Sequence, residues 1–318
     1  MRNPTAPARA ELVGVAERLS WLPLVLEAVE LERLERPLPA ARATTVVRLR
    51  GGGEEGLGED VTFQAADMLS RALDPEPMRA VSTLGGLWEW LDSAELFERP
   101  PLHSVVRSYR RWAVEAAALD LALRQAQLSF AGVVGRAPAP VRFVVSPRRA
   151  HSRGFPGARL KIDATDLAPG LPVEIVDFKG EGDAALVERA RAWYPRALLE
   201  DAPVLLEGAL LSWDIRIESA AALERLPPAT VAINVKPARL GSVRALFELY
   251  AACAARGIDV YGGGQDELGP GRAQIQLLAA LFHADAPNDV APAGYNEAAP
   301  PTGLPASPLA VTSRPGFR

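Results

Sequence analysis

Residues Val231–Gly241 read V-A-I-N-V-K-P-A-R-L-G, and this stretch decides the fold class. Its apolar first half is typical of a strand buried in a parallel sheet. Lys236 closes the apolar run, and Pro237 marks the point where the chain leaves the sheet, because proline donates no ladder hydrogen bond. A lysine at the end of a buried strand needs a partner or a function, so the other strand ends bear on its role.

Further strand-like segments surround this one in the second half of the chain. They lie at 141–146, 158–163, 173–178, 197–201, 209–214 and 258–262. Helical patterns alternate with them at 184–193, 220–225, 242–256 and 272–282. This alternation predicts a parallel sheet with right-handed crossovers. So many strands in succession favour a closed barrel of the TIM type over an open sheet.

The first part of the chain has a different rhythm. A β-branched run at 43–49 leads through the glycine-rich segment Arg50–Asp60 to a second strand, which predicts a hairpin. A long helical pattern runs from about Val105 to Phe130. The segment G-R-A-P-A-P at 135–140 marks a boundary. We therefore expect an α+β domain at 1–138, a barrel domain at 139–290 and a Pro/Ala-rich tail at 291–318.

The composition argues against several classes of function. The net charge is −4 and the pI about 5.6, which does not favour nucleic-acid or anionic-membrane partners. No apolar run is long enough for a membrane span, and the first residues lack a signal-peptide core. The single cysteine, Cys253, fits a reducing compartment. We expect a cytoplasmic protein, and we also expect a homo-oligomer.

Ionisable residues close five of the predicted strands: Lys161, Asp177, Glu200, Asp214 and Lys236. In a parallel barrel the C-terminal strand ends converge on one mouth, where active sites are built. Three carboxylates without histidine or cysteine are hard oxygen ligands that suit Mg²⁺, and the metal would offset their repulsion. Any one of these residues alone is more often a helix cap or a solvated charge. Their shared position at strand ends favours a metal site.

Five motifs stand in a fixed order along the chain. They are the hairpin at 42–60 with its G-L-G-E-D ending, Glu115 with A-L-D-L at 118–121, R-L-K-I-D at 159–163, I-N-V-K-P-A-R-L-G-S at 233–242, and G-G-G-Q-D-E-L-G-P-G at 262–271. In this order they resemble the enolase superfamily, and within it the mandelate racemase / muconate lactonizing group. The resemblance covers about residues 10–296.

The resemblance implies a modified (β/α)7β TIM barrel whose mouth is closed by the N-terminal capping domain. It implies Mg²⁺ held by Asp177, Glu200 and Asp214, with Lys161 and Lys236 as acid and base. The chemistry of that family is abstraction of the proton α to a carboxylate, through an enediolate that the metal stabilises. The expected function is thus a lyase or isomerase for a small carboxylate, similar to o-succinylbenzoate synthase, a cycloisomerase or a dehydratase. The remaining candidates for contact with the substrate or its surroundings are Lys179, Trp213, Asp266 and Glu267.

The sequence departs from the family pattern in three places. Lys179 stands where the family has asparagine, and an extra cation there would be an alternative to the metal's charge. Only 15 residues separate Lys161 from Asp177 and 13 separate Glu200 from Asp214, so we predict trimmed helices after the second and fourth strands. The fifth strand lacks the adjacent D-E pair of the group, which leaves Glu218 as an alternative ligand to Asp214.

Two further expectations follow from the resemblance and these departures. The glycine-rich segment Gly51–Gly58 is expected to be a mobile loop over the site. The departures also leave a second hypothesis of function open, a non-catalytic barrel that binds a small carboxylate or a protein partner.

Overall fold

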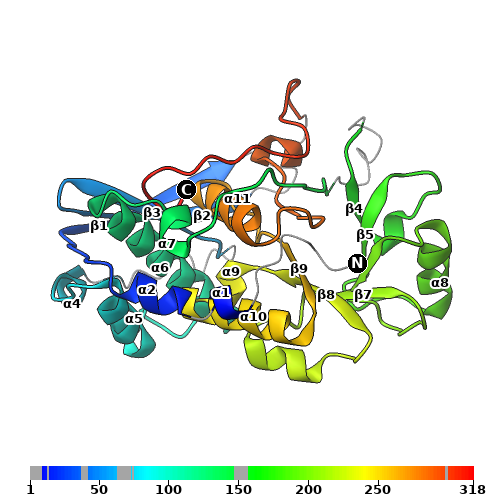
Figure 1. The fold of residues 1–318 in the computed structure, drawn as a ribbon, viewed down its shortest axis with the longest axis horizontal. Helices are drawn as coiled ribbons and strands as arrows, with labels where there is room; N and C mark the ends of the chain where they lie inside the picture. Colours follow the sequence, from blue (N-terminus) through cyan, green and yellow to red (C-terminus); the bar gives the residue numbers. More distant parts are fainter. Residues whose placement is uncertain are drawn as a thin grey trace.

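The computed structural model describes residues 9–12, 14–36, 42–62, 73, 75–146, 157–297 and 300–318. Figure 1 shows the N-terminal sheet with its helices at one end of the molecule and strands β4 and β5 with helix α8 at the other. Within the described ranges, no helix combines the length and the apolar character needed to cross a membrane.

The N-terminal domain is an antiparallel sheet with one long helix packed across it. The strands lie in the order β1 (Ala28–Arg36), β2 (Arg42–Gly51) and β3 (Glu54–Asp60). Helix α6 (Val105–Gln125) packs on β3, and a Cβ at Gly56 or Gly58 would collide with carbonyl oxygens of that helix. The predicted hairpin is confirmed. The prediction of a mobile loop at Gly51–Gly58 is wrong, because the second half of this segment is a strand whose glycines allow close packing against α6.

Shorter helices complete this domain: α1 (Arg9–Leu12), α2 (Val15–Ser20), α4 (Pro75–Arg79), α5 (Leu84–Ser93) and α7 (Phe130–Val134). The long helix ends earlier than the predicted Phe130. Gln127 takes a left-handed φ of 55°, which ends α6, and the Ser129 hydroxyl then caps α7 by accepting from Gly132 N.

The second half of the chain forms the expected parallel barrel. Its strands pair in chain order: β4 (Leu160–Asp163), β5 (Val173–Asp177), β6 (Leu198–Glu200), β7 (Leu210–Trp213), β8 (Thr230–Val235) and β9 (Asp259–Gly262). Three isolated parallel bridges extend this sheet into a ring: Val145–Leu160 joins one further segment to β4, Gly263–Asp289 joins another to the residue after β9, and Phe143–Asn288 joins these two segments to each other. The segments at 141–145 and 288–289 therefore take the first and eighth positions of the ring.

The crossovers after the second and fourth strands are trimmed, as predicted. A single 3₁₀ turn, η2 (Ala164–Asp166), follows β4, and residues 201–209 after β6, all of them described, contain no helix. The helix expected at 220–225 is a 3₁₀ helix, η3 (Ala220–Arg225). Longer crossovers remain elsewhere: α8 (Ala184–Trp193) after β5, α9 (Pro237–Leu240) and α10 (Val243–Arg256) after β8, and α11 (Pro270–Phe282) after β9.

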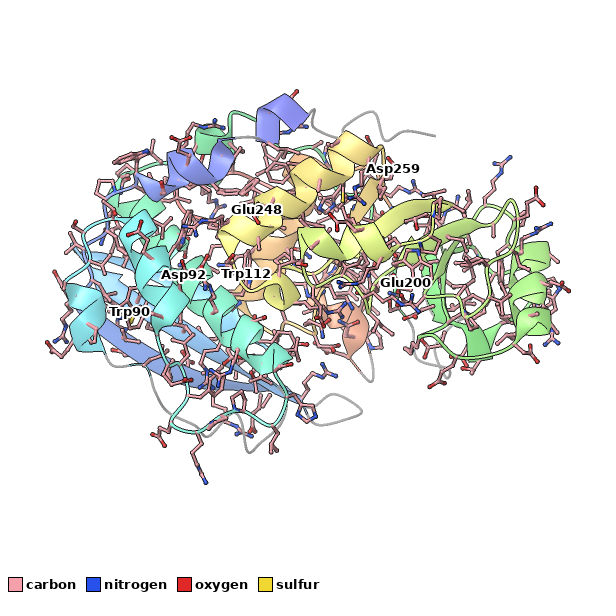
Figure 2. All side chains as sticks on the ribbon, turned by 90° about the horizontal axis from the view of Figure 1, so that it is seen from below. Trp90, Asp92, Trp112, Glu200, Glu248 and Asp259 are labelled. Atoms are coloured by element: carbon pink, nitrogen blue, oxygen red, sulfur yellow. The ribbon has the colours of Figure 1, made fainter. Side chains whose placement is uncertain are left out.

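One apolar core joins the two domains. Trp112 of α6, which lies near the centre of the molecule in Figure 2, belongs to the same buried cluster as Phe247 of α10 and Phe282 of α11. Glu59 of β3 adds a polar link, since its carboxylate accepts from the backbone N–H groups of Leu268, Gly269 and Gly271 where α11 begins. The N-terminal domain is thereby fixed beside the loop that follows β9.

The C-terminal tail contains a short 3₁₀ helix, η4 (Ala293–Asn296), and then returns to the N-terminal domain (Figure 1). Phe317 is 1% exposed, and its ring centroid lies 4.7 Å from that of Phe130 and 6.4 Å from that of Trp112. The buried Asp120 carboxylate accepts from Phe317 N at 2.8 Å. The end of the chain is therefore part of the core.

Phe317→Ala should lower the free energy of unfolding by about 3–5 kcal/mol, because it opens a cavity among Trp112 and Phe130. Urea unfolding measures the change. Leu205→Ala, at a side chain that is 52% exposed, is the matched control and should stay within about 0.5 kcal/mol of the parent. A loss below about 1 kcal/mol for Phe317→Ala would contradict an integral tail.

Candidate active site

The strand register sets the levels of the side chains inside the barrel. Ile175, Leu198 and Ala232 form an interior layer with Val144 and Tyr261. Side chains alternate between the two faces of a strand, so the residues two positions further along point inward as well. These are Asp177, Glu200 and Asn234, one layer closer to the mouth. The register places Asp163 beside Asp177, and Ser212 beside Glu200, at the same level.

Lys161 is surrounded by carboxylates from three positions of the ring. Its Nζ forms an ion pair with Glu200 and lies 3.7 Å from Asp177 Oδ2 and 3.5 Å from Asp289 Oδ2. Burial opposes the charge of this lysine, but the Glu200, Asp289 and Asp177 charges outweigh it and raise the pKa of Lys161 well above its ordinary value. The lysine is therefore held in its protonated form.

Glu200 is the most enclosed of these carboxylates. It is 0% exposed, and its second oxygen accepts from Tyr261 OH and from Asn234 Nδ2, the latter at 3.1 Å. Tyr261 OH also lies 3.1 Å from Ser212 Oγ. The floor of the site is thus a hydrogen-bonded network of polar side chains from four neighbouring strands.

Asp177, Glu200 and Asp201 each place a carboxylate oxygen within 4.8 Å of the others. Burial raises the pKa of Asp177 to about 6. Among the described residues, Lys161 is the one cation in an ion pair with Asp177, Glu200 or Asp289. Negative charge therefore exceeds positive charge here, and each carboxylate oxygen can accept more than one partner. This donor set fits a hard divalent cation such as Mg²⁺.

Asp214, the expected third ligand, lies outside that group of carboxylates. It follows Ser212 by two residues and so stands one layer above Glu200, where Lys236 Nζ donates to it at 2.6 Å and Arg239 Nη1 at 2.8 Å. Burial opposes its charge, but Lys236 and Arg239 outweigh burial and lower the pKa of Asp214 to about 2. The alternative ligand, Glu218, is exposed.

The other candidates occupy the rim of the barrel and its seam with the N-terminal domain. Lys179 forms an ion pair with Asp163, with both side chains about half exposed. Trp213 is buried and donates from Nε1 to Thr230 Oγ1 at 2.9 Å, which is a packing role. Asp266 pairs with Arg42 of β2. Glu267 is buried in the same loop and accepts from Gln265 N.

Left-handed backbone recurs at the mouth. Lys179, Asp201 and Asp266 have φ values of 55°, 50° and 67°, and they lie in the loops after β5, β6 and β9. Hydrogen bonds hold two of these turns: Lys179 N donates to Asp177 Oδ1, and the Asp201 carboxylate accepts from the N–H groups of Asp214 and Ile215. Such strained residues concentrate at functional sites.

The chain contains three lysines among its 35 lysine and arginine residues, and all three belong to the barrel: one lies within a strand and two lie just beyond the C-terminal end of a strand. They are Lys161 on β4, Lys179 after β5 and Lys236 after β8. Lysine differs from arginine in that its amine can lose a proton in proteins. The chain thus uses arginine for its other basic positions and places its titratable amines around the mouth.

The sequence alone does not reveal several residues of the site. Tyr261 and Asp289 stand out by no charge or spacing in the sequence. Asp201 ends the predicted strand 197–201 and Arg239 lies in the motif at 233–242, but neither pattern distinguishes them from neighbouring charged residues. Asn234, two residues before Lys236, could have been found from strand alternation. Arg239 also links the site to the N-terminal domain, because its Nη2 donates to Gln265 Oε1 and Gln265 Nε2 donates to Tyr109 OH of α6.

A buried histidine, His283, helps to position the segment that carries Asp289. His283 Nδ1 lies 2.6 Å from Asn288 Oδ1, which also accepts from Gly262 N, so Nδ1 carries the proton. His283 Nε2 then accepts from Tyr250 OH at 3.0 Å. This arrangement fixes Asn288, and with it the eighth ring position next to Lys161.

Solved structures share this fold over nearly the whole chain. An enolase-superfamily member from Listeria innocua has a TM-score of 0.66 at 18% identity, over 92% of this chain and 94% of that one. Muconate cycloisomerase from Pseudomonas fluorescens also has a TM-score of 0.66 at 18% identity, over 93% and 96%. The fold is that of the enolase superfamily, and the expected resemblance to its mandelate racemase / muconate lactonizing group is confirmed.

Family models identify the chain more narrowly. A model described as the C-terminal domain of the domain of unknown function DUF8230 matches residues 137–297, and its N-terminal counterpart matches 17–133. The chain belongs to this DUF8230 family. An N-succinylamino acid racemase from Amycolatopsis is 28% identical, over 83% of this chain and 85% of the relative.

Acid should destabilise the protein through His283. Burial lowers the pKa of His283 to about 4, below its ordinary 6.5. Between these two pH values the imidazole is therefore protonated in the unfolded chain and neutral in the folded state. This stability is present above pH 6.5 and is lost as the pH falls toward 4. Between pH 7 and pH 5 the parent should lose about 2 kcal/mol of unfolding free energy relative to His283→Gln. Equal pH dependence of the two proteins in urea unfolding would contradict the buried neutral imidazole.

Proposed function

We propose that the protein is a Mg²⁺-dependent lyase or isomerase that abstracts the proton α to the carboxylate of a small molecule. The observation that carries this proposal is the pairing of Lys161 and Lys236 with the buried carboxylates Glu200 and Asp214 at the barrel mouth. The similarity to muconate cycloisomerase and to an N-succinylamino acid racemase supports this class of reaction.

Asp177 and Glu200, together with Asp201 or Asp214, would hold the metal. When bound, Mg²⁺ supplies positive charge that stabilises the negative charge developing on the substrate carboxylate. The buried network of Asn234 and Tyr261 orients Glu200 from below.

Lys161 and Lys236 are placed for proton transfer from opposite sides. Their strands, β4 and β8, hold the second and sixth positions of the eight-position ring and so face each other across the mouth. The surrounding carboxylates favour the protonated form of Lys161, which suits its Nζ to the role of acid or stabilising cation. Lys236 Nζ, in its neutral amine form, would then take the α-proton.

Lys179 is assigned to substrate binding. Its ion pair with Asp163 is exposed, and exposed pairs are worth little, so a negatively charged part of the substrate can replace Asp163 as its partner. Lys179 does not stand among Asp177, Glu200 and Asp201, which argues against its replacing a metal ion there.

A second function has one observation in its favour. In this structure the carboxylates of Glu200 and Asp214 already accept donors of the chain at both oxygens. Carboxylates whose oxygens already accept hydrogen bonds from the chain would suit a non-catalytic barrel that binds a small carboxylate through its rim. The two proposed functions differ in whether the protein catalyses a reaction, so an assay for catalysis distinguishes them.

The deciding experiment measures exchange of α-hydrogen for deuterium in D₂O over a panel of small carboxylates, with and without Mg²⁺. We expect exchange that requires Mg²⁺ and falls by about 10²- to 10⁴-fold in Lys161→Ala or Lys236→Ala, because each removes a proton-transfer group. Exchange that neither substitution changes would contradict the mechanism. No exchange with any member of the panel would favour the binding protein.

Lys179→Ala is the matched control among the lysines. It should raise the half-saturating substrate concentration and leave the exchange rate at saturation within about threefold, because it removes a binding contact and no proton carrier. A loss at saturation as large as that of Lys236→Ala would assign Lys179 to the chemistry itself.

A further inference from the structure

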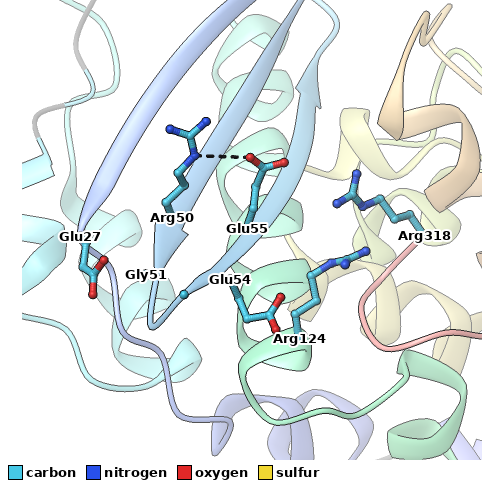
Figure 3. A pocket seen from close by; sticks show the side chains of 8 residues that line it. Glu27, Arg50, Gly51, Glu54, Glu55, Arg124 and Arg318 are labelled. Atoms are coloured by element: carbon cyan, nitrogen blue, oxygen red, sulfur yellow. Dashed lines mark hydrogen bonds and ion pairs between the residues drawn. The ribbon is translucent and has the colours of Figure 1, made fainter.

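A cavity of about 450 Å³ lies on the N-terminal domain, and none of the candidate active-site residues lines it. Figure 3 shows it between the turn of the β2–β3 hairpin, the last turn of α6 and the end of the chain. Its lining is strongly polar: Glu27, Arg50, Gly51, Gly53, Glu54, Glu55, Arg124 and Arg318.

Two guanidinium groups at one side of the cavity share a single buried carboxylate. Arg124 Nε donates to Asp120 Oδ1 at 3.2 Å, and Arg318 Nε lies 2.9 Å from Asp120 Oδ2 without being aligned for a hydrogen bond. Asp120 is 0% exposed and also accepts from the backbone N–H groups of Leu57 and Phe317. The pair of arginines therefore carries one positive charge more than its carboxylate neutralises.

The Nη groups of both arginines remain available. Among the described residues, none accepts a hydrogen bond from Nη1 or Nη2 of Arg124 or Arg318. Two adjacent guanidinium groups with free Nη atoms form a fork that suits a carboxylate or another oxyanion.

Carboxylates without a cationic partner line the rest of the cavity. Glu27 accepts from Gly52 N and Glu54 accepts from Gln127 Nε2, and in the described part of the chain neither forms an ion pair. Arg50 adds no free charge, because it is paired with Glu30 and Glu55. Figure 3 shows Glu27 on the side of the cavity away from Arg124 and Arg318.

We infer that this cavity binds a small zwitterion of the amino-acid class. The anionic group would lie between Arg124 and Arg318, and the ammonium group would face Glu27 and Glu54. A simple anion would satisfy only one side of the cavity and leave Glu27 and Glu54 without a cation, and a simple amine would do the reverse.

Calorimetric titration of the whole protein tests this with unbranched ω-amino acids, from glycine through β-alanine and 4-aminobutanoate to 5-aminopentanoate. Each amino acid is compared with two half-probes, which carry only one of its two charged groups: the carboxylate and the alkylamine of matching length. At least one amino acid should bind about tenfold more tightly than both of its half-probes, the gain expected for one additional charge-assisted hydrogen bond. The inference is overturned if no amino acid exceeds its half-probes or if no probe binds.

Variants assign the two ends of the ligand. In the double variant Glu27→Gln with Glu54→Gln, the amino acid should bind no more tightly than the matching carboxylate. In Arg124→Gln, it should bind no more tightly than the matching alkylamine. The exposed Glu27 and the half-buried Glu54 can be changed without touching the core, which keeps the test valid if Arg124→Gln fails to fold. Arg33→Gln, at an exposed arginine paired with Glu35 outside the cavity, is the matched control and should keep the full advantage. An advantage that persists in the double glutamine variant also overturns the inference.

Discussion

The ion pair between Lys161 and Glu200 is the constraint on which the barrel mouth depends. A buried ammonium group is costly unless carboxylates surround it, and here they come from the third, fourth and eighth positions of the ring. The short strands β5 and β6 and the bridge-held segment at 288–289 must therefore stay in register around one amine. Three carboxylates surround this one amine, and we propose that the negative charge that remains attracts a cation.

The helical motif of Glu115 and A-L-D-L contains two acidic residues whose contacts explain why the motif is needed. Glu115 Oε2 accepts from Val243 N at the start of α10, and Asp120 accepts from Leu57 N of β3 and Phe317 N of the tail. Both are buried, so each needs these donors. The motif thus joins the helix of the N-terminal domain to the barrel, to its own sheet and to the end of the chain.

The strands and the trimmed crossovers could be predicted because they depend on local pattern and chain length. Apolar runs such as Val231–Val235 are visible along the chain, and the few residues between Glu200 and Asp214 leave no room for a helix. The layer of the barrel in which each charged side chain lies could not be predicted. It depends on the register between paired strands, which the sequence of one strand does not contain. Asp214 and Glu200 both end strands, yet Asp214 stands one layer higher, with Lys236 and Arg239. Asp289 stands in a segment without periodicity, and its position beside Lys161 depends on hydrogen bonds to residues that are distant in the sequence, Gly262 and Ser146.

The proposed function requires the carboxylates around Lys161 to bind a divalent cation. The most direct measurement is a crystal structure of the protein grown with Mn²⁺, with anomalous scattering recorded at the manganese edge. We predict an anomalous peak in contact with Asp177 and Glu200, with Lys161 Nζ turned from Glu200 toward Asp289. A structure without manganese at these carboxylates, in which Lys161 keeps its ion pair with Glu200, would contradict it.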